Sequence, residues 1–122
     1  DNVGGIMAAE GTTDFECAVA RAMTSKFGVG GASFHVGGQA GPALTVYLGC
    51  FQRNALERVG GYDDSMVRAQ DWEMNLRIRE SGGIVWFTPE MRVTYRPRHT
   101  LGALARHFSG ADLKQAARPV LR

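Results

Sequence analysis

The sequence has no long apolar run, and only two of its 122 residues are cysteines. A membrane-spanning helix needs about 18 or more consecutive apolar residues, so no such helix is expected. Cys17 and Cys50 lie far apart, with no second cysteine or histidine at ligand spacing. This spacing argues against a disulfide framework and against a zinc site. We therefore expect two buried free thiols and a reducing, cytoplasmic location.

Several short motifs that define other functions are also missing. The N-terminal residues show no basic segment followed by an apolar one, so they contain no visible signal peptide. The glycines of residues 27–42 are not followed by Gly-Lys-Ser/Thr, which excludes a phosphate-binding P-loop. No nucleic-acid-binding signature accompanies the basic residues, and we expect no nucleic-acid partner.

Charge is unevenly distributed along the chain. Residues 1–89 carry 7 basic and 10 acidic side chains, whereas residues 90–122 carry 7 basic and 2 acidic ones. Helical spacing of apolar residues from Leu101 to Phe108 predicts a basic amphipathic helix over residues 98–122. Such a tail can contact phosphate groups or an anionic membrane surface, and a solvated helix face is the alternative. Residues 1–97 would form the core of a single partial domain.

Periodicity and turn residues predict an α/β domain. The predicted strands cover residues 2–9, 44–51, 84–87 and 91–96. The predicted helices begin at Thr12, Thr13 or Asp14, near Arg53, and at Gln70 or Asp71. Thr88-Pro89 predicts a turn, Gly60 or Gly61 a helix end, and residues 27–42 a long mobile loop. The Gly4-Gly5 pair predicts a bend or a close backbone approach.

The stretch RAQDWEMNLRIRESGG, residues 68–83, gives two conflicting signals. Its apolar and polar residues alternate, as in a strand, but its composition and the final Gly pair favour a helix. On a helix the apolar residues fall on two nearly opposite faces, Ala69-Trp72-Leu76 and Met74-Ile78. We therefore predict a helix that is buried on two sides.

Three segments in this order resemble a known family: YLGCFQRNALERVGGYDD, then AQDWEMNLRIRESGG, then IVWFTPEMRVTYRPR. The chain is similar to the second half of inverting family-2 glycosyltransferases with the GT-A fold, of the bacterial succinoglycan and exopolysaccharide type. The resemblance covers essentially residues 1–110. It implies a partial GT-A-like mixed sheet flanked by helices, which lacks the N-terminal nucleotide-binding half.

In that family a Gly-Gly-aromatic-Asp turn leads into a helix with a Glu-Asp pair, whose Asp is the catalytic base. Gly60-Gly61-Tyr62-Asp63 matches the turn, and Gln70-Asp71 matches the pair with Gln in place of Glu. Because Gln70 cannot take a proton, the resemblance leaves Asp71 as the candidate catalytic base. Glu73 is the competitor; on a helix it lies about 200° around the axis from Asp71.

The resemblance also places other residues near the substrates. The expected substrate-binding residues are Gln70, Trp72, Gly49, Tyr62 and Arg68. Trp72 could form a wall against a sugar ring, and a core tryptophan is the alternative. The substrates implied are a nucleotide-sugar donor and a glycan or lipid-linked acceptor.

The metal-binding Asp-x-Asp motif of the family is absent from this sequence. We therefore expect no metal bound by this chain alone and no activity in isolation, with Mg²⁺ or Mn²⁺ needed by the full-length enzyme. The alternative is a non-catalytic binding module that kept the scaffold. A partial domain would expose apolar surface, which favours self-association, and the basic tail could hold the protein at the inner membrane face.

Overall fold

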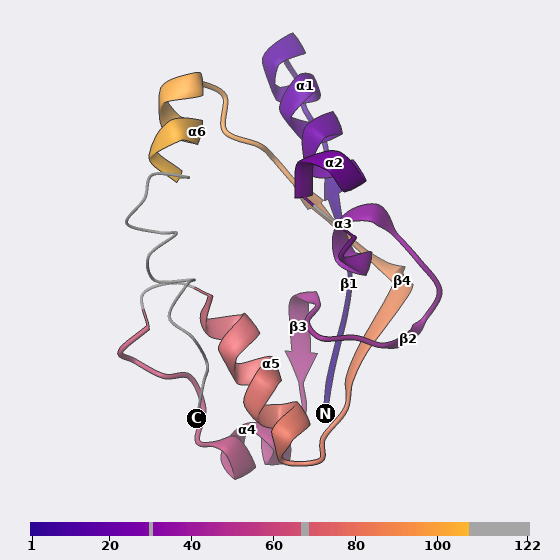
Figure 1. Cartoon of the computed structure of the whole chain (residues 1–122), viewed down its shortest axis with the longest axis vertical. Helices are drawn as coiled ribbons and strands as arrows, with labels where there is room; N and C mark the ends of the chain where they lie inside the picture. Colours follow the sequence, from indigo (N-terminus) through magenta and orange to yellow (C-terminus); the bar gives the residue numbers. More distant parts are fainter. Residues whose placement is uncertain (30, 67–68, 108–122) are drawn as a thin grey trace.

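The computed structural model describes residues 1–29, 31–66 and 69–107, and it shows a mixed α/β arrangement (Figure 1). The elements in chain order are β1 (Asn2–Ala9), α1 (Asp14–Met23), α2 (Lys26–Val29), α3 (Ser33–Val36), β2 (Gly41–Pro42), β3 (Tyr47–Phe51), α4 (Arg53–Val59), α5 (Gln70–Glu80), β4 (Val85–Tyr95) and α6 (Leu101–His107). None of the described helices is long and apolar enough to cross a membrane.

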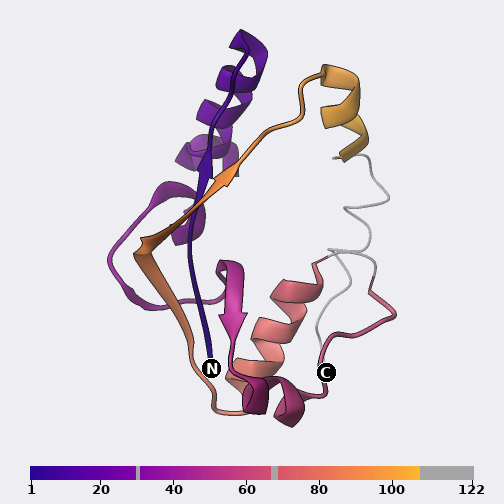
Figure 2. The ribbon, with the colours of Figure 1, turned by 180° about the vertical axis from the view of Figure 1, so that it is seen from behind.

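The strands form one mixed sheet in the order β2-β4-β1-β3. β1 runs parallel to β4 and antiparallel to β3, and β2 is antiparallel to β4. The long β1–β4 pair extends along the molecule, with α1 and α6 toward one end and α4 and α5 toward the other (Figures 1 and 2). The predicted mixed sheet flanked by helices is confirmed.

Gly4 and Gly5 allow a close approach in the middle of this sheet. The register of β1 shifts at this pair against both of its neighbours. A Cβ on Gly4 would overlap the side chain of Val46, and one on Gly5 would overlap the backbone of Met91. The prediction of a bend or close backbone approach at this pair is confirmed.

The two strands predicted from residue 84 to residue 96 are in fact the single strand β4. The expected turn at Thr88-Pro89 falls where the pairing of β4 with β1 shifts between Gly4 and Ile6. Residues 88–91 of β4 therefore form the bulge, opposite the single residue Gly5 of β1, and a proline without an N–H does not remove a regular ladder bond there. The sequence signal was real, but it marks a bulge.

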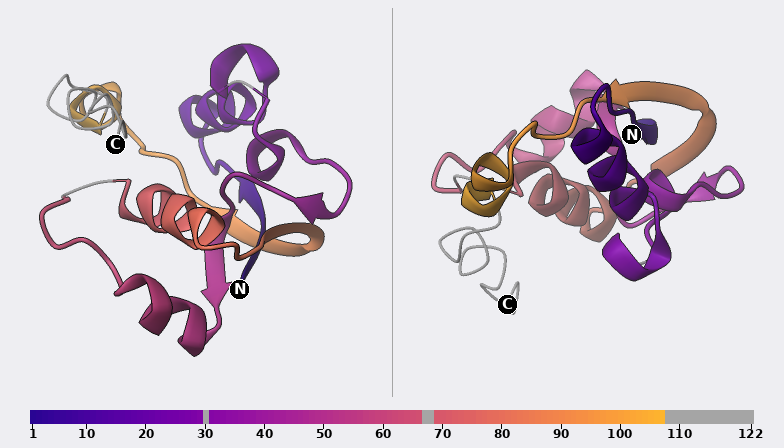
Figure 3. Two further views of the ribbon diagram at one scale, coloured as in Figure 1. Left: turned by 60° about the horizontal axis from the view of Figure 1, so that its bottom comes forward. Right: turned by 90° about the horizontal axis from the view of Figure 1, so that it is seen from above.

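The core lies on one face of the sheet, where α5 packs alongside β3 and β4 (Figure 3). Val85 and Phe87 point inward from β4 and meet Met74 and Ile78 of α5, all at most 1% exposed. Trp86, between the two inward residues, is 41% exposed. Burial of α5 on two sides was wrong, because Ala69 and Trp72 on its other face are exposed.

Other local predictions meet mixed outcomes. Gly60 ends α4 in the left-handed conformation with φ 82°, as predicted. The region predicted as a long loop contains α2, α3 and β2. Cys17 and Cys50 are free, but both are exposed. Cys50 pairs with Val3 in the sheet, and Val3 pairs with Trp86, so Cys50 faces outward with Trp86.

The predicted basic tail is described as far as α6. Thr100 begins this helix, since its hydroxyl accepts a hydrogen bond from the Ala103 N–H at 3.2 Å. His99 joins the tail to α1, with Nδ1 3.6 Å from Oε1 of Glu16. The remainder of the predicted helix over residues 98–122 lies outside the described residues.

Candidate functional site

Asp71, the candidate base, lies in the first turn of α5. The preceding Ala69 adopts φ 58° and gives the helix no side-chain cap. The Asp71 carboxylate is exposed, and its Oδ1 accepts a hydrogen bond from the Trp72 N–H at 2.9 Å. Free N–H groups at a helix start favour a negative charge. The helix therefore presents this carboxylate to solvent, where a substrate hydroxyl could reach it.

Glu73, the competing carboxylate, is held in an ion pair. Arg77 donates from Nε to Oε1 at 2.5 Å and from Nη2 to Oε2 at 2.6 Å. Arg77 also donates to the carbonyls of Val59 and Gly61, the latter at 2.7 Å. The hydrogen bonds with Glu73 raise the pKa of Arg77 above its usual value. Glu73 and Arg77 thus form a clamp that fixes the end of α4 to α5.

The matched turn Gly60-Gly61-Tyr62-Asp63 is a structural connection between these helices. Gly60 and Gly61 adopt positive φ values of 82° and 74°. Asp63 accepts hydrogen bonds from the N–H and hydroxyl of Ser65 at 2.9 and 2.6 Å, which lower the pKa of its carboxyl. Tyr62 is 50% exposed, and its ring meets Phe51 edge-to-face at 6.5 Å between centroids.

The other expected substrate-binding residues have different surroundings. Gln70 donates from Nε2 to the carbonyl of Met66 at 2.6 Å, which ties the start of α5 to the preceding turn. The open side of Gly49 is filled by Asn2, since a Cβ there would lie 2.2 Å from Asn2 Oδ1. Arg68 lies outside the described residues.

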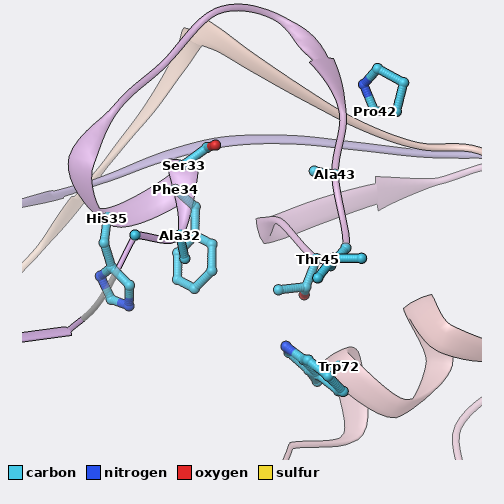
Figure 4. A pocket seen from close by; sticks show the side chains of 10 residues that line it. Ala32, Ser33, Phe34, His35, Pro42, Ala43, Thr45 and Trp72 are labelled. Atoms are coloured by element: carbon cyan, nitrogen blue, oxygen red, sulfur yellow. The ribbon is translucent and has the colours of Figure 1, made fainter. Parts of the chain in front are cut away.

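Trp72 lines a pocket of about 550 Å³ that separates α5 from the glycine-rich segment. Figure 4 shows Trp72 on one side, Phe34 and His35 of α3 on the other, and Thr45 between them. The volume suits a small ligand, and the ring of Trp72 is 46% exposed. Asp71 is not among the residues that line this pocket, although it adjoins Trp72.

His35 brings a neutral polar group to this pocket. Burial lowers the pKa of His35 below its usual value, which favours the uncharged form of the imidazole. Its ring packs on Phe34 with centroids 4.2 Å apart. Within the described residues its buried Nδ1 has no hydrogen-bond partner, and no group of three or more His, Cys, Asp or Glu could hold a metal ion.

Sequence reasoning missed Thr45 and Phe34 as pocket residues. Both lie in or beside the glycine-rich region, whose lack of periodicity hides which side chains turn inward. It also missed Asn75, which is 1% exposed on the buried side of α5. The one signal in the sequence that could have shown its burial was its position next to Met74 and three residues before Ile78.

The mixed sheet flanked by helices is compatible with part of a glycosyltransferase fold. The chain is similar to the succinoglycan biosynthesis protein ExoA of Rhizobium meliloti (strain 1021), at 31% identity over 129 aligned residues. The match includes all of this chain but only 39% of that protein's length. No family model and no solved structure matched the chain. The similarity supports the glycosyltransferase resemblance at the level of the family.

Proposed function

We propose that this chain is the acceptor-side part of an inverting family-2 glycosyltransferase with a GT-A fold. The full protein would transfer a sugar from a nucleotide-sugar donor to a glycan or lipid-linked acceptor. The observation that carries the proposal is the different state of two nearby carboxylates: Glu73 is clamped by Arg77, whereas Asp71 is exposed and directly precedes Trp72, which lines the pocket. The similarity to a succinoglycan biosynthesis protein supports this class of reaction.

Asp71 would act as the general base in this reaction. The acceptor hydroxyl attacks the anomeric carbon and gives its proton to a carboxylate oxygen of Asp71, while the bond to the nucleotide diphosphate breaks on the opposite side. A base in this role must come within about 2.6–3.2 Å of the hydroxyl oxygen. Trp72 would hold the acceptor ring through its apolar face, which orients the hydroxyl toward the adjoining residue.

The leaving diphosphate needs positive charge that this chain does not obviously supply. The Asp-x-Asp motif is absent from the sequence, and the described residues contain no cluster suited to a metal ion. In the full-length enzyme Mg²⁺ or Mn²⁺, bound by residues outside this chain, would neutralise that charge. We therefore propose that the isolated chain does not catalyse transfer.

Two surfaces of the chain support further proposals about partners. The basic tail, with Arg98 and His99 exposed before α6, would contact a lipid-linked acceptor or the inner membrane face. On the sheet face away from α5, Trp86 and Cys50 are exposed next to Val3. This apolar face would pack against the missing half or, in the isolated chain, against a second copy.

The proposal is tested by assaying sugar transfer with Mn²⁺ or Mg²⁺. The 122-residue chain is compared with a form that includes the coding sequence upstream of Asp1. We expect transfer only from the longer form, with the product carrying the anomeric configuration opposite to that of the donor, as read by NMR. Retention of configuration would contradict the proposed mechanism, and substrate binding without transfer in the longer form would favour the non-catalytic binding module.

A further inference from the structure

A chain of buried side-chain hydrogen bonds reaches the Trp72 pocket from the centre of the protein. Asn2 of β1 donates from Nδ2 to Oδ1 of Asn75 at 2.6 Å. Asn75 of α5 then donates from Nδ2 to the Thr45 hydroxyl oxygen at 2.9 Å. Asn2 and Asn75 are 3% and 1% exposed, whereas Thr45 lines the pocket between Trp72 and Phe34 (Figure 4).

This order of donors and acceptors fixes the polarity of the Thr45 hydroxyl. Because its oxygen accepts the hydrogen bond from Asn75, its own proton is free to point into the pocket. Turning over the Asn75 amide alone would bring its Nδ2 against the Asn2 Nδ2 and lose this hydrogen bond. Thr45 therefore offers a hydrogen-bond donor to whatever occupies the pocket.

The position of Asn2 is itself tightly determined. Its backbone pairs with Phe51 on one side and Val85 on the other. Gly49 leaves the space that the Asn2 side chain fills, because any Cβ at Gly49 would overlap it. Within the described residues Asn2 Oδ1 has no partner, which an apolar side chain would avoid. The network is thus rigid but costly to stability, which points to a role outside the core.

The chemistry of the pocket favours a neutral ligand with an apolar face. The described residues that line it include no Asp, Glu, Lys or Arg, and burial lowers the pKa of His35, which favours its uncharged imidazole. These lining residues therefore offer a diphosphate no permanent positive charge. Trp72 and Phe34 offer aromatic surface, and Thr45 and Ser33 offer hydroxyls. A saccharide ring presents both an apolar face and hydroxyl groups that match these features.

We propose that the pocket is the subsite for a neutral acceptor saccharide and that Asn75 is a positioning residue, which acts by directing the Thr45 hydroxyl to donate to an oxygen of that sugar. This inference rests on the proposed function and names the ligand of the pocket that Trp72 lines. It assigns Asn75 and Asn2 to acceptor recognition through Thr45, with no contact between either residue and the sugar.

The experiment uses the 122-residue chain with methyl β-D-glucopyranoside and methyl β-D-galactopyranoside as probes. Binding is followed by the indole N–H signals of the two tryptophans in ¹H–¹⁵N spectra. Trp86 lies on the opposite sheet face and serves as the internal control. We expect at least one glycoside to shift the Trp72 signal in a saturable manner and to leave the Trp86 signal unchanged.

Variants then separate the effect of the Thr45 hydroxyl on binding from the effect of Asn75, which directs it. Thr45→Val should weaken binding about three- to ten-fold, the loss expected for one neutral hydrogen bond, whereas Thr45→Ser should bind like the wild type. Asn75→Asp turns the donor at position 75 into an acceptor and should weaken binding by a similar factor. In the Thr45→Val background Asn75→Asp should cause no further loss, since its effect passes through the hydroxyl.

Each alternative outcome is informative. If Thr45→Val binds like the wild type, or if Asn75→Asp weakens binding equally in both backgrounds, the positioning role is overturned. If Asn75→Asp does not fold, Asn75→Leu also removes the hydrogen-bond donor at this position and carries the same expectation. Asn54→Asp, at an exposed position in α4, is the matched control. If neither glycoside moves the Trp72 signal, the saccharide subsite is overturned, whereas the proposed function is decided separately by the transfer assay.

Discussion

The N-termini of α1 and α5 differ in how they use their carboxylates. At α1 Thr13 is the cap, and Oε2 of Glu16 accepts hydrogen bonds from Thr12 N–H, Thr12 hydroxyl and Thr13 N–H at 2.7, 2.6 and 3.1 Å. These bonds lower the pKa of Glu16 to about 2. At α5 Ala69 provides no cap, and the Asp71 carboxylate remains at the surface.

This difference shows that the start of α1 is arranged for stability, whereas the start of α5 is not. The capping box of α1 gives free N–H groups of the helix start a hydrogen-bond acceptor, and the Glu16 carboxylate is occupied by these hydrogen bonds. The start of α5 includes a non-glycine residue at φ 58°, which is a strained conformation for alanine. Departures from local sequence preference of this kind concentrate at functional sites. The comparison therefore supports a functional role for the start of α5.

The largest stability effect is expected from breaking the clamp beside Asp71. Arg77→Met removes two hydrogen bonds to Glu73 and two to the end of α4, and it leaves a partly buried carboxylate unpaired. The free energy of unfolding should fall by about 1–3 kcal/mol. Urea denaturation measures the change, and Arg53→Met at an exposed position is the control. A loss no larger than that of the control would show that the clamp is not structural.

A second prediction concerns the carboxylate at α1 and its dependence on pH. The pKa of Glu16 is about 2 in the folded chain and 4.5 as the ordinary value, so the folded state favours the ionised form. Its contribution to stability is present above pH 4.5 and is lost as the pH falls toward 2. Glu16→Gln should lower stability at pH 7 and flatten the fall in stability across this range. Identical pH profiles for wild type and Glu16→Gln would contradict the capping role.

The smallest effect is expected from relieving strain at the start of α5. Ala69→Gly should stabilise the chain by about 0.5–1 kcal/mol, because glycine adopts positive φ without a steric penalty. The matched control is Ala18→Gly at an exposed position within α1, which should destabilise it by about 1 kcal/mol. Thermal unfolding of both variants gives the comparison. Destabilisation by Ala69→Gly would mean that Ala69 is not strained in the folded chain.

Much of the fold could be predicted because the signals are local. The cap predicted at Thr12, Thr13 or Asp14 and the left-handed helix end predicted at Gly60 or Gly61 depend on residues within one helical turn, and the structure has them at Thr13 and Gly60. The sequence also predicted a strand over residues 84–87, which the structure confirms from Val85 onward as part of β4. The catalytic role of Asp71 came from a family resemblance, and it stays a prediction.

The features that were missed depend on contacts between distant residues. Val85 and Phe87 decide which face of α5 is buried. The periodicity of residues within the helix does not contain this information. The hydrogen bond between Asn2 and Asn75 joins positions 73 residues apart. The pocket likewise joins α5 to the region of residues 31–45. The spacing of the cysteines correctly predicted that they are free but not that they are exposed; the exposure of Cys50 follows from the alternation of β3.

The most direct test of the central claim compares Asp71→Asn with Asp14→Asn in the form that includes the upstream sequence. Both residues are exposed and lie in the first turn of a helix, so they differ mainly in their surroundings. We expect Asp71→Asn to lower the rate of transfer by about 10²- to 10⁴-fold while the circular dichroism spectrum stays unchanged, and Asp14→Asn to keep the wild-type rate. A wild-type rate for Asp71→Asn would contradict its assignment as the base.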